Sequence, residues 1–172
     1  SDLNNNQVID FDGTGDLLLR NLNIADNLPD GNQDRTLFIL VKYRGLGWGG
    51  IAYGNNNSND AFGLVVSNTD GKLTVQGWGG ANDFKSTADG TGAGWIINSV
   101  ILDSGAITHY LNNVVIDTQT HTYTTALQEI VVAANLSQTT YIDMQVAAFL
   151  LYDRALTPAE HTAVYDYLNA KY

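Results

Sequence analysis

Trp78 and its neighbours form the part of this chain best suited to bind another molecule. In an extended strand at residues 73–78, alternation places Trp78 on the polar face rather than with the core residues. Glycines flank the ring, and Asn82, Asp83 and Phe84 follow with amide, carboxylate and aromatic groups. A sugar offers its C–H face to such rings and its hydroxyls to such polar groups. We therefore predict a carbohydrate site here; the alternative is that Trp78 caps the sheet edge and packs under a loop.

A second tryptophan lies in a similar setting. The tetrapeptide Gly-Trp-Gly-Gly occurs at residues 47–50 and again at residues 77–80. Two short copies do not make a repeat architecture, so we interpret them as two similar positions near loops. Trp48, together with Tyr53 and the Asn-rich loop at residues 55–60, is thus a second candidate for ligand binding, with the same packing alternative.

Oxygen ligands for a hard cation occur near the start of the chain. Asp10, Asp12 and Asp16 surround a glycine turn, and calcium takes about six to eight oxygen ligands. Asp60, in the Asn-rich loop, is an alternative ligand. All but two of the 18 acidic residues are aspartate, which favours turns and cation-binding loops. The same residues could instead form an ordinary Asp-Gly turn, or belong to an acidic surface that keeps the protein soluble.

The residues needed for common kinds of catalysis are missing or scattered. A glycosidase uses a pair of carboxylic acids, but the chain has only two glutamates, Glu129 and Glu160, and the second is expected to cap a helix. There is no Gly-x-Ser-x-Gly or His-Glu-x-x-His motif, no cysteine, and the three histidines are far apart in sequence. We therefore predict that this domain is not an enzyme.

The composition excludes several classes of partner. A formal net charge of −10 repels phosphate backbones, which excludes nucleic acid. No run approaches the roughly 18 apolar residues of a membrane span. The absence of cysteine excludes disulfides and zinc–thiolate sites. The first residues lack a signal-peptide pattern, so we expect either a mature protein or part of a longer one.

The elements that must position these residues are mainly strands. Turn signals every eight to twelve residues or so are typical of a sandwich or barrel, and 172 residues suit a single domain, residues 1–172. The expected strands lie at residues 35–43, 61–67, 72–78, 95–103, 106–111, 114–116, 128–134 and 141–152. Near the C-terminus, Thr157, Pro158 and Glu160 have the spacing of an N-cap, first-turn proline and capping box. They predict one helix at residues 158–170.

Three segments resemble the bacterial laminin-G-like, concanavalin A-like domains. Residues 146–160 are similar to the family's closing strand, Tyr-(Asn/Asp)-Arg-Ala-Leu motif and helix, residues 8–18 to its opening strand pair, and residues 95–113 to its middle hairpin. The resemblance implies a two-sheet antiparallel jelly-roll sandwich in which the terminal strands are neighbours and Trp95 lies in the core. Ala148 stands where the family often has glutamate, so its ligand residues are not carried over.

Together these observations predict a non-catalytic, lectin-like recognition module for a glycan or polysaccharide, with calcium as a candidate cofactor. We expect it in a larger secreted or bacterial surface protein such as an adhesin, hence an extracellular location. The alternative is a structural or protein-binding β-sandwich that docks neighbouring domains of the same polypeptide. Exposure of Trp48 and Trp78 would favour the first hypothesis, and burial of both the second.

Overall fold

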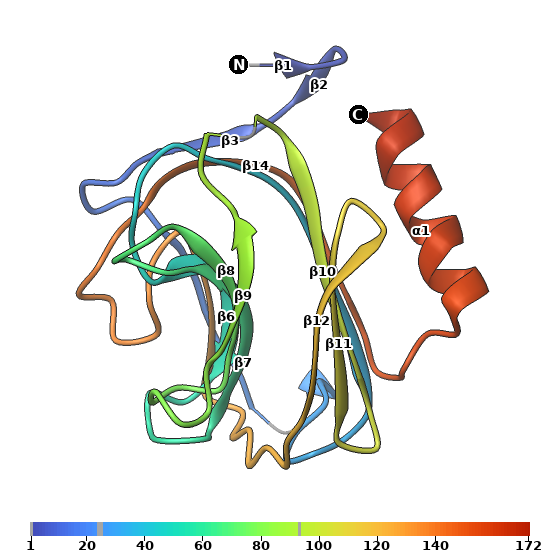
Figure 1. Ribbon diagram of the computed structural model, residues 1–172. Helices are drawn as coiled ribbons and strands as arrows, with labels where there is room; N and C mark the ends of the chain where they lie inside the picture. Colours follow the sequence, from blue (N-terminus) through green and yellow to red (C-terminus); the bar gives the residue numbers. More distant parts are fainter. Residues whose placement is uncertain (1, 24–25, 93) are drawn as a thin grey trace.

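The computed structural model describes residues 2–23, 26–92 and 94–172. These residues form a sandwich of two six-stranded antiparallel sheets, with a two-stranded ribbon and one helix (Figure 1). The elements are β1 (Asp2–Leu3), β2 (Asn6–Gln7), β3 (Ile9–Asp12), β4 (Leu18–Asn21), β5 (Arg35–Tyr43), β6 (Gly49–Gly54), β7 (Ala61–Val66), β8 (Lys72–Gln76), β9 (Phe84–Asp89), β10 (Ile96–Asp103), β11 (Ala106–Leu111), β12 (Val114–Thr120), β13 (Glu129–Val132), β14 (Asp143–Tyr152) and α1 (Pro158–Lys171). The predicted all-β jelly-roll sandwich with a C-terminal helix is confirmed.

The first sheet, in the order β12-β11-β10-β5-β14-β3, brings the two ends of the chain together. Strand β14 pairs with both β5 and β3, so Met144 stands opposite Tyr43 on one side and Phe11 on the other. Strand β5 is buried on both faces along nearly its whole length, as expected of a central strand. The prediction that the N-terminal and C-terminal strands are neighbours is confirmed.

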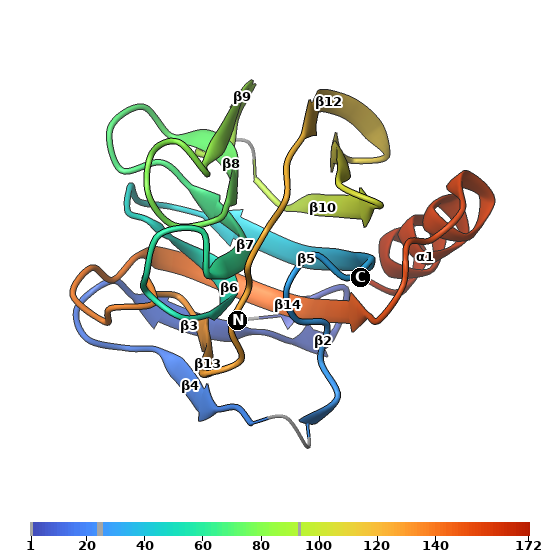
Figure 2. The same ribbon diagram turned by 90° about the horizontal axis from the view of Figure 1, so that it is seen from below.

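The second sheet has the order β4-β13-β6-β7-β8-β9 and packs face to face with the first. Its inward side chains, among them Ile51, Phe62, Leu64 and Val75, form the main core with those of the first sheet. Viewed from below, helix α1 lies beyond the first sheet and away from the second (Figure 2). The outer face of the second sheet is therefore the broad face that no described helix covers.

A positively charged arginine side chain is buried in the core. Arg35 is fully buried, and its guanidinium donates to the carbonyls of Gln33 and Gly31, both at 2.7 Å, and to Tyr53 Oη at 2.8 Å. The guanidinium carbon also lies 4.9 Å from the centre of the Phe62 ring. Neutral oxygens and aromatic faces, rather than a carboxylate, replace the water that this charge loses on folding.

Helix α1 packs on the outer face of the first sheet. Its capping box is present as predicted: Glu160 N donates to Thr157 Oγ1 at 3.3 Å, and Thr157 N donates to Glu160 Oε2 at 2.9 Å. Leu168 is buried in the hydrophobic cluster that also contains Phe38 and Leu40 of β5. No helix among the described residues is long and apolar enough to cross a membrane.

Two strands of the second sheet lie outside the predicted set. Strand β6 contains three glycines, a composition typical of a loop, yet all six of its residues are buried. At Gly50 a Cβ would lie 2.1 Å from the Leu64 carbonyl oxygen, so glycine serves close strand packing here rather than a turn. Strand β9 is the other addition. The strand expected at residues 72–78 stops at Gln76, because the chain turns at Gly77 and Trp78.

Trp95 occupies a different place from the one that the resemblance implied. It precedes β10 and packs against the cluster beneath the helix, which includes Ile97 and Leu168, rather than between the two sheets. Its side chain is half-buried. Trp95 thus lies on the opposite side of the molecule from the outer face of the second sheet.

Candidate functional site

An open groove of about 490 Å³ lies on the outer face of the second sheet. This volume falls within the range of about 300–1,000 Å³ that is usual for ligand sites. Its position follows from its two tryptophans, which pack on the outward-facing cluster containing Ala52, Val65 and Val131. We call it the tryptophan groove; it is lined by Trp48, Gln76, Trp78, Gly79, Gly80, Asp83, Lys85 and Asn135.

The strand register explains how the two tryptophans come to share one groove. Trp48 directly precedes β6 and Trp78 follows β8, and β7 lies between these two strands. Across the strands, Ala52 stands opposite Gly63, and Gly63 opposite Gln76. A Cβ on Gly63 would lie 2.5 Å from that of Ala52. Small residues therefore keep the sheet surface low between the two rings, and the two predicted positions become one site.

The Trp78 backbone is fixed from both sides. Its φ of 68° is in the left-handed region, which non-glycine residues rarely adopt. Asp83 Oδ1 accepts hydrogen bonds from the N–H groups of Gly77 at 3.1 Å and Trp78 at 3.0 Å. On the other side, the Trp78 carbonyl accepts a bond of 3.0 Å from Asn82 Nδ2. Asn82 and Asp83, both predicted as ligand residues, thus orient the half-buried Trp78 ring, and Asp83 also lines the groove.

Gln76 lines the groove, but its amide oxygen is buried beneath the surface. The residue is only 3% exposed, and Oε1 is buried without a hydrogen-bond partner among the described residues. The oxygen and nitrogen of such an amide are assigned from their hydrogen bonds, and this environment offers the oxygen no donor. A buried polar group without a partner costs on the order of 1–3 kcal/mol.

The Asp83 carboxylate is held partly out of water. Burial raises its pKa above the ordinary aspartate value, although the N–H groups of Gly77 and Trp78 act in the opposite direction. Both of these bonds go to Oδ1, and Oδ2 accepts none from the described residues. Asp83 can therefore support the Trp78 turn and still accept a hydrogen bond from a ligand.

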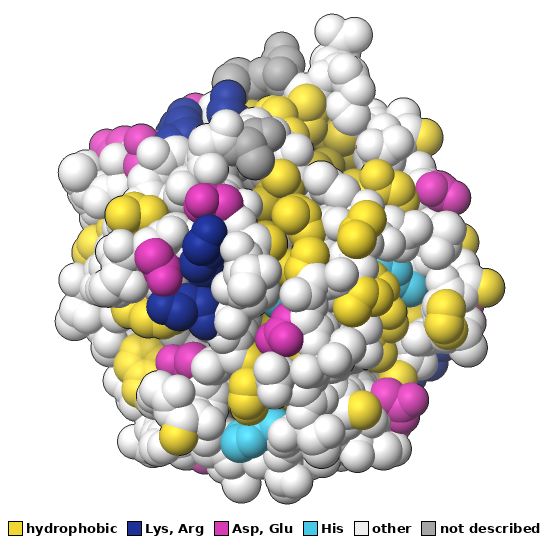
Figure 3. Space-filling view, viewed as in Figure 1, with side chains coloured by type: hydrophobic (Ala, Val, Ile, Leu, Met, Phe, Trp, Pro, Cys, Tyr) yellow, Lys and Arg dark blue, Asp and Glu magenta, His cyan; other side chains and the backbone are white. Residues whose placement is uncertain are grey.

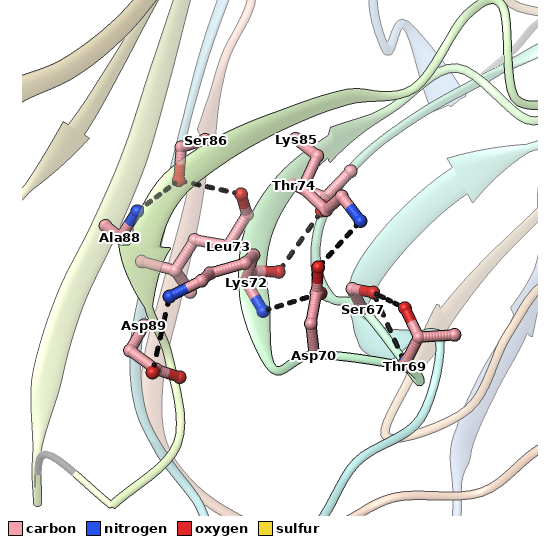
Figure 4. A network of polar contacts seen from close by, with 10 residues as sticks. All are labelled: Ser67, Thr69, Asp70, Lys72, Leu73, Thr74, Lys85, Ser86, Ala88 and Asp89. Atoms are coloured by element: carbon pink, nitrogen blue, oxygen red, sulfur yellow. Dashed lines mark hydrogen bonds and ion pairs between the residues drawn. The ribbon is translucent and has the colours of Figure 1, made fainter.

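Lys85 enters the groove from β9 and is held by an ion pair. Its Nζ lies 2.8 Å from Asp70 Oδ2, and nearby Lys72 Nζ lies 3.4 Å from Asp89 Oδ2 (Figure 4). The bond from Lys85 lowers the pKa of Asp70 to about 2, so Asp70 is ionised at neutral pH. On the surface, basic and acidic side chains lie next to each other over β8 and β9 (Figure 3).

Two of the predicted ligand residues lie elsewhere. Phe84 stands opposite the core residue Val75 and packs inward, with its ring 5.1 Å from that of His121. Tyr53 is fully buried, and its hydroxyl donates to the Pro29 carbonyl at 3.0 Å. Neither residue lines the tryptophan groove, because both occupy inward-facing positions of their strands.

The structure does not bring the predicted calcium ligands together. Asp10 is ion-paired with Arg44, and Asp12 accepts two bonds of 2.7 Å from the threonine two residues along. Asp60 lies between β6 and β7 in the other sheet, and Asp16 is exposed between β3 and β4. Among the described residues, no three acidic, histidine or cysteine side chains could hold one metal ion. Calcium binding itself stays a prediction.

One cluster has the hydrogen-bond order of a serine-nucleophile triad. Ser99 Oγ lies 2.9 Å from His161 Nε2, and His161 Nδ1 lies 3.1 Å from Asn113 Oδ1. Ser99 is only 1% exposed, however, beneath helix α1. A substrate carbonyl cannot reach a hydroxyl in this position, so we attribute these contacts to docking of the helix.

Sequence reasoning missed three residues of the groove. Gln76 could have been found from the sequence, because strand alternation turns it away from the core residue Val75. Lys85 could be assigned to the groove only once strand β9 was known. Asn135 comes from the distant connection between β13 and β14, where its Oδ1 accepts a 2.9 Å bond from Thr139 N. No local pattern predicts that this connection reaches the tryptophans.

Comparison with known sequences finds no relative: no protein-family model and no curated protein sequence matches this chain. Solved structures do match. Trypanosoma rangeli sialidase aligns with 91% of the chain at a TM-score of 0.67 and 15% identity, and the match spans only 26% of that protein. The chain thus corresponds to about a quarter of the sialidase's length.

Two further matches are comparable in size to this chain. CBM40 of the Ruminococcus gnavus IT-sialidase, bound to α2,3-sialyllactose, aligns over 91% of this chain and 97% of its own length, with a TM-score of 0.61 and 14% identity. Domain 4 of AbnA, a GH43 extracellular arabinanase from Geobacillus stearothermophilus, was solved with arabinotriose; it aligns over 80% of this chain and 68% of its own, with a TM-score of 0.58 and 22% identity. At these identities the likeness shows the concanavalin A-like, jelly-roll sandwich fold.

Proposed function

We propose that this domain is a non-catalytic carbohydrate-binding module and that the tryptophan groove is its ligand site. The observation that carries the proposal is the coincidence, in one open groove, of two half-buried indoles and the Asp83 carboxylate, whose Oδ2 accepts no hydrogen bond from the described residues. Neither Trp48 nor Trp78 is buried completely, so both rings keep surface for a ligand.

The chemistry of the groove fits a sugar ring. Indole faces attract the C–H face of a pyranose or furanose, much as they stack on bases. Oδ2 of Asp83 accepts hydrogen bonds from hydroxyls. Further support comes from the structural neighbours, which include two domains solved with a bound saccharide.

The absence of catalysis is part of the proposal. Glycoside hydrolysis needs two carboxyl groups that flank the scissile bond, and among the described residues Asp83 is the only carboxylate that lines the groove. We further propose that the domain works outside the cell as part of a larger secreted or surface protein such as an adhesin. Its acidic composition and lack of cysteine are compatible with that setting.

The test is a glycan array, run with calcium and with a chelator, followed by titrations monitored by tryptophan fluorescence. Trp48→Ala should weaken binding by about 1–3 kcal/mol, by analogy with base stacking. Trp95→Ala is the matched control, because Trp95 lies on the helix side of the molecule, and it should bind as the wild type does. Equal losses in both variants would refute the placement of the ligand in the groove. A folded wild-type domain that binds no glycan would instead favour the protein-docking alternative.

A further inference from the structure

The fold alone does not indicate whether the ligand is charged. Among the structural neighbours with a bound saccharide, one holds sialyllactose, which carries a carboxylate, and another holds arabinotriose, which is neutral. The charges around the tryptophan groove come from this chain's own side chains. They can therefore be used to infer the class of sugar.

Asp83 gives the groove a negative charge that no described residue of the lining neutralises. Its Oδ1 bonds to the N–H groups of Gly77 and Trp78, and Oδ2 accepts no bond from the described residues. No basic side chain forms an ion pair with Asp83 within the described part of the chain. A ligand carboxylate placed on the tryptophans would meet this charge in a partly dehydrated site, where repulsion is stronger than in bulk water.

Lys85 is the basic residue that lines the groove, but its charge is already paired. Its Nζ lies 2.8 Å from Asp70 Oδ2, and Asp70 Oδ1 accepts a hydrogen bond from Lys72 N at 3.3 Å, which fixes the carboxylate in its own turn (Figure 4). Asp83, Lys85 and Asp70 together carry one net negative charge, and the whole chain carries −10. Both the local and the long-range field therefore disfavour an anion.

The unpartnered oxygen of Asp83 favours hydroxyl groups. Asp83 Oδ2 is an acceptor in the groove lining, and a hydroxyl can donate to it. A carboxylate offers only acceptors at neutral pH and would leave this oxygen unsatisfied. We infer that the tryptophan groove selects neutral oligosaccharides and rejects sugars that carry a carboxylate. This inference rests on the proposed function, because it concerns the ligand of the same groove.

The experiment compares pairs of probes that differ mainly in charge: lactose with α2,3-sialyllactose, xylan with glucuronoxylan oligosaccharides, and methyl-esterified with free galacturonan oligosaccharides. In each pair that binds, we expect the neutral member to bind at least about tenfold more tightly at low salt. The difference should shrink at high salt, because screening weakens the repulsion.

Two conservative variants test whether these charges cause the preference for neutral sugars. Asp83→Asn keeps the Oδ1 acceptor for Gly77 and Trp78 while removing the charge, and Asp70→Asn leaves the Lys85 charge unpaired. Either variant should raise the affinity for the carboxylated probe relative to its neutral partner by about tenfold. Asp89→Asn removes the same charge from the Lys72 ion pair, outside the groove lining, and should leave the selectivity as in the wild type.

Loss of the predicted charge selectivity and loss of glycan binding altogether give different results in these experiments. Equal or tighter binding of the carboxylated probes by the wild type, abolished by Trp48→Ala, would overturn the inference and leave the glycan site standing. A change of selectivity in Asp89→Asn as large as in Asp83→Asn would also overturn it, since the effect would then be one of net charge. Failure of every probe to bind the folded domain would overturn the proposed function and the inference together.

Discussion

Replacing Trp78 by alanine and by glycine separates the contribution of its ring to stability from the cost of its left-handed backbone conformation. Truncating a fully buried aromatic residue costs about 3–5 kcal/mol, and Trp78 is half-buried, so Trp78→Ala should lower the free energy of unfolding by about 2 kcal/mol. Trp78→Gly removes one more carbon, but a φ of 68° is unstrained for glycine and costs other residues roughly 1–2 kcal/mol. We therefore expect Trp78→Gly to be more stable than Trp78→Ala by about 1 kcal/mol.

Urea unfolding and thermal melts of the two variants measure this difference, and glycan titrations should show equal losses of binding. Greater stability of the alanine variant would show that Trp78 does not hold the left-handed conformation in solution. Retention of full affinity by either variant would show that the ring takes no part in binding. A loss of stability as large as that of a fully buried aromatic residue, without loss of affinity, would identify Trp78 as a packing residue.

Three further predictions concern stability. Burial lowers the pKa of His161 to about 4, below its unfolded value of about 6.5, so the native state binds fewer protons than the unfolded state. Stability should therefore fall as the pH drops from about 6.5 to 4, by on the order of 2 kcal/mol once solvent screening is allowed for. Urea unfolding at several pH values should show this dependence reduced in His161→Leu, and an unchanged slope would refute it. Arg35→Lys should cost about 3 kcal/mol, because an ammonium cannot replace the fork that bonds several oxygens at once; a melt within error of the wild type would contradict this. Gln76→Leu should gain about 1 kcal/mol of stability by removing an unsatisfied amide oxygen, and a loss of stability in urea unfolding would show that the amide has a partner in solution.

Local rules were enough to predict much of the fold. The helix follows from Thr157 and Glu160, whose capping box is a contact between near neighbours in sequence. The strand from Arg35 to Tyr43 follows from apolar residues on both faces. Strand β6 could not be found in this way, because its glycines have the composition of a loop. Gly50 is required instead by the backbone of β7, Gly54 by the backbone at residues 60–61, and Gly49 by the side chain of Ile142, and these atoms lie next to the glycines only after the chain has folded.

The site was predictable only in part. Trp78 lies apart from the main core, as predicted, but the turn after β8 places it there rather than strand alternation. The glycine context linked it to Trp48. Tyr53 was misplaced because its aromatic ring and the adjoining polar loop resemble a binding surface, whereas β6 turns the ring inward to Arg35. Asn135 depends on a connection that folds across the sheet from a distant part of the chain.

The groove contains two positions at which the folded chain is less stable than it could be. Trp78 holds a conformation suited to glycine, and Gln76 buries an amide oxygen that leucine would not need to satisfy. Selection for thermostability alone should therefore alter these two positions early, and with them the groove. In laboratory evolution of this domain, a screen that combines heat resistance with glycan capture should keep Trp78, whereas a screen for heat resistance alone should replace both residues.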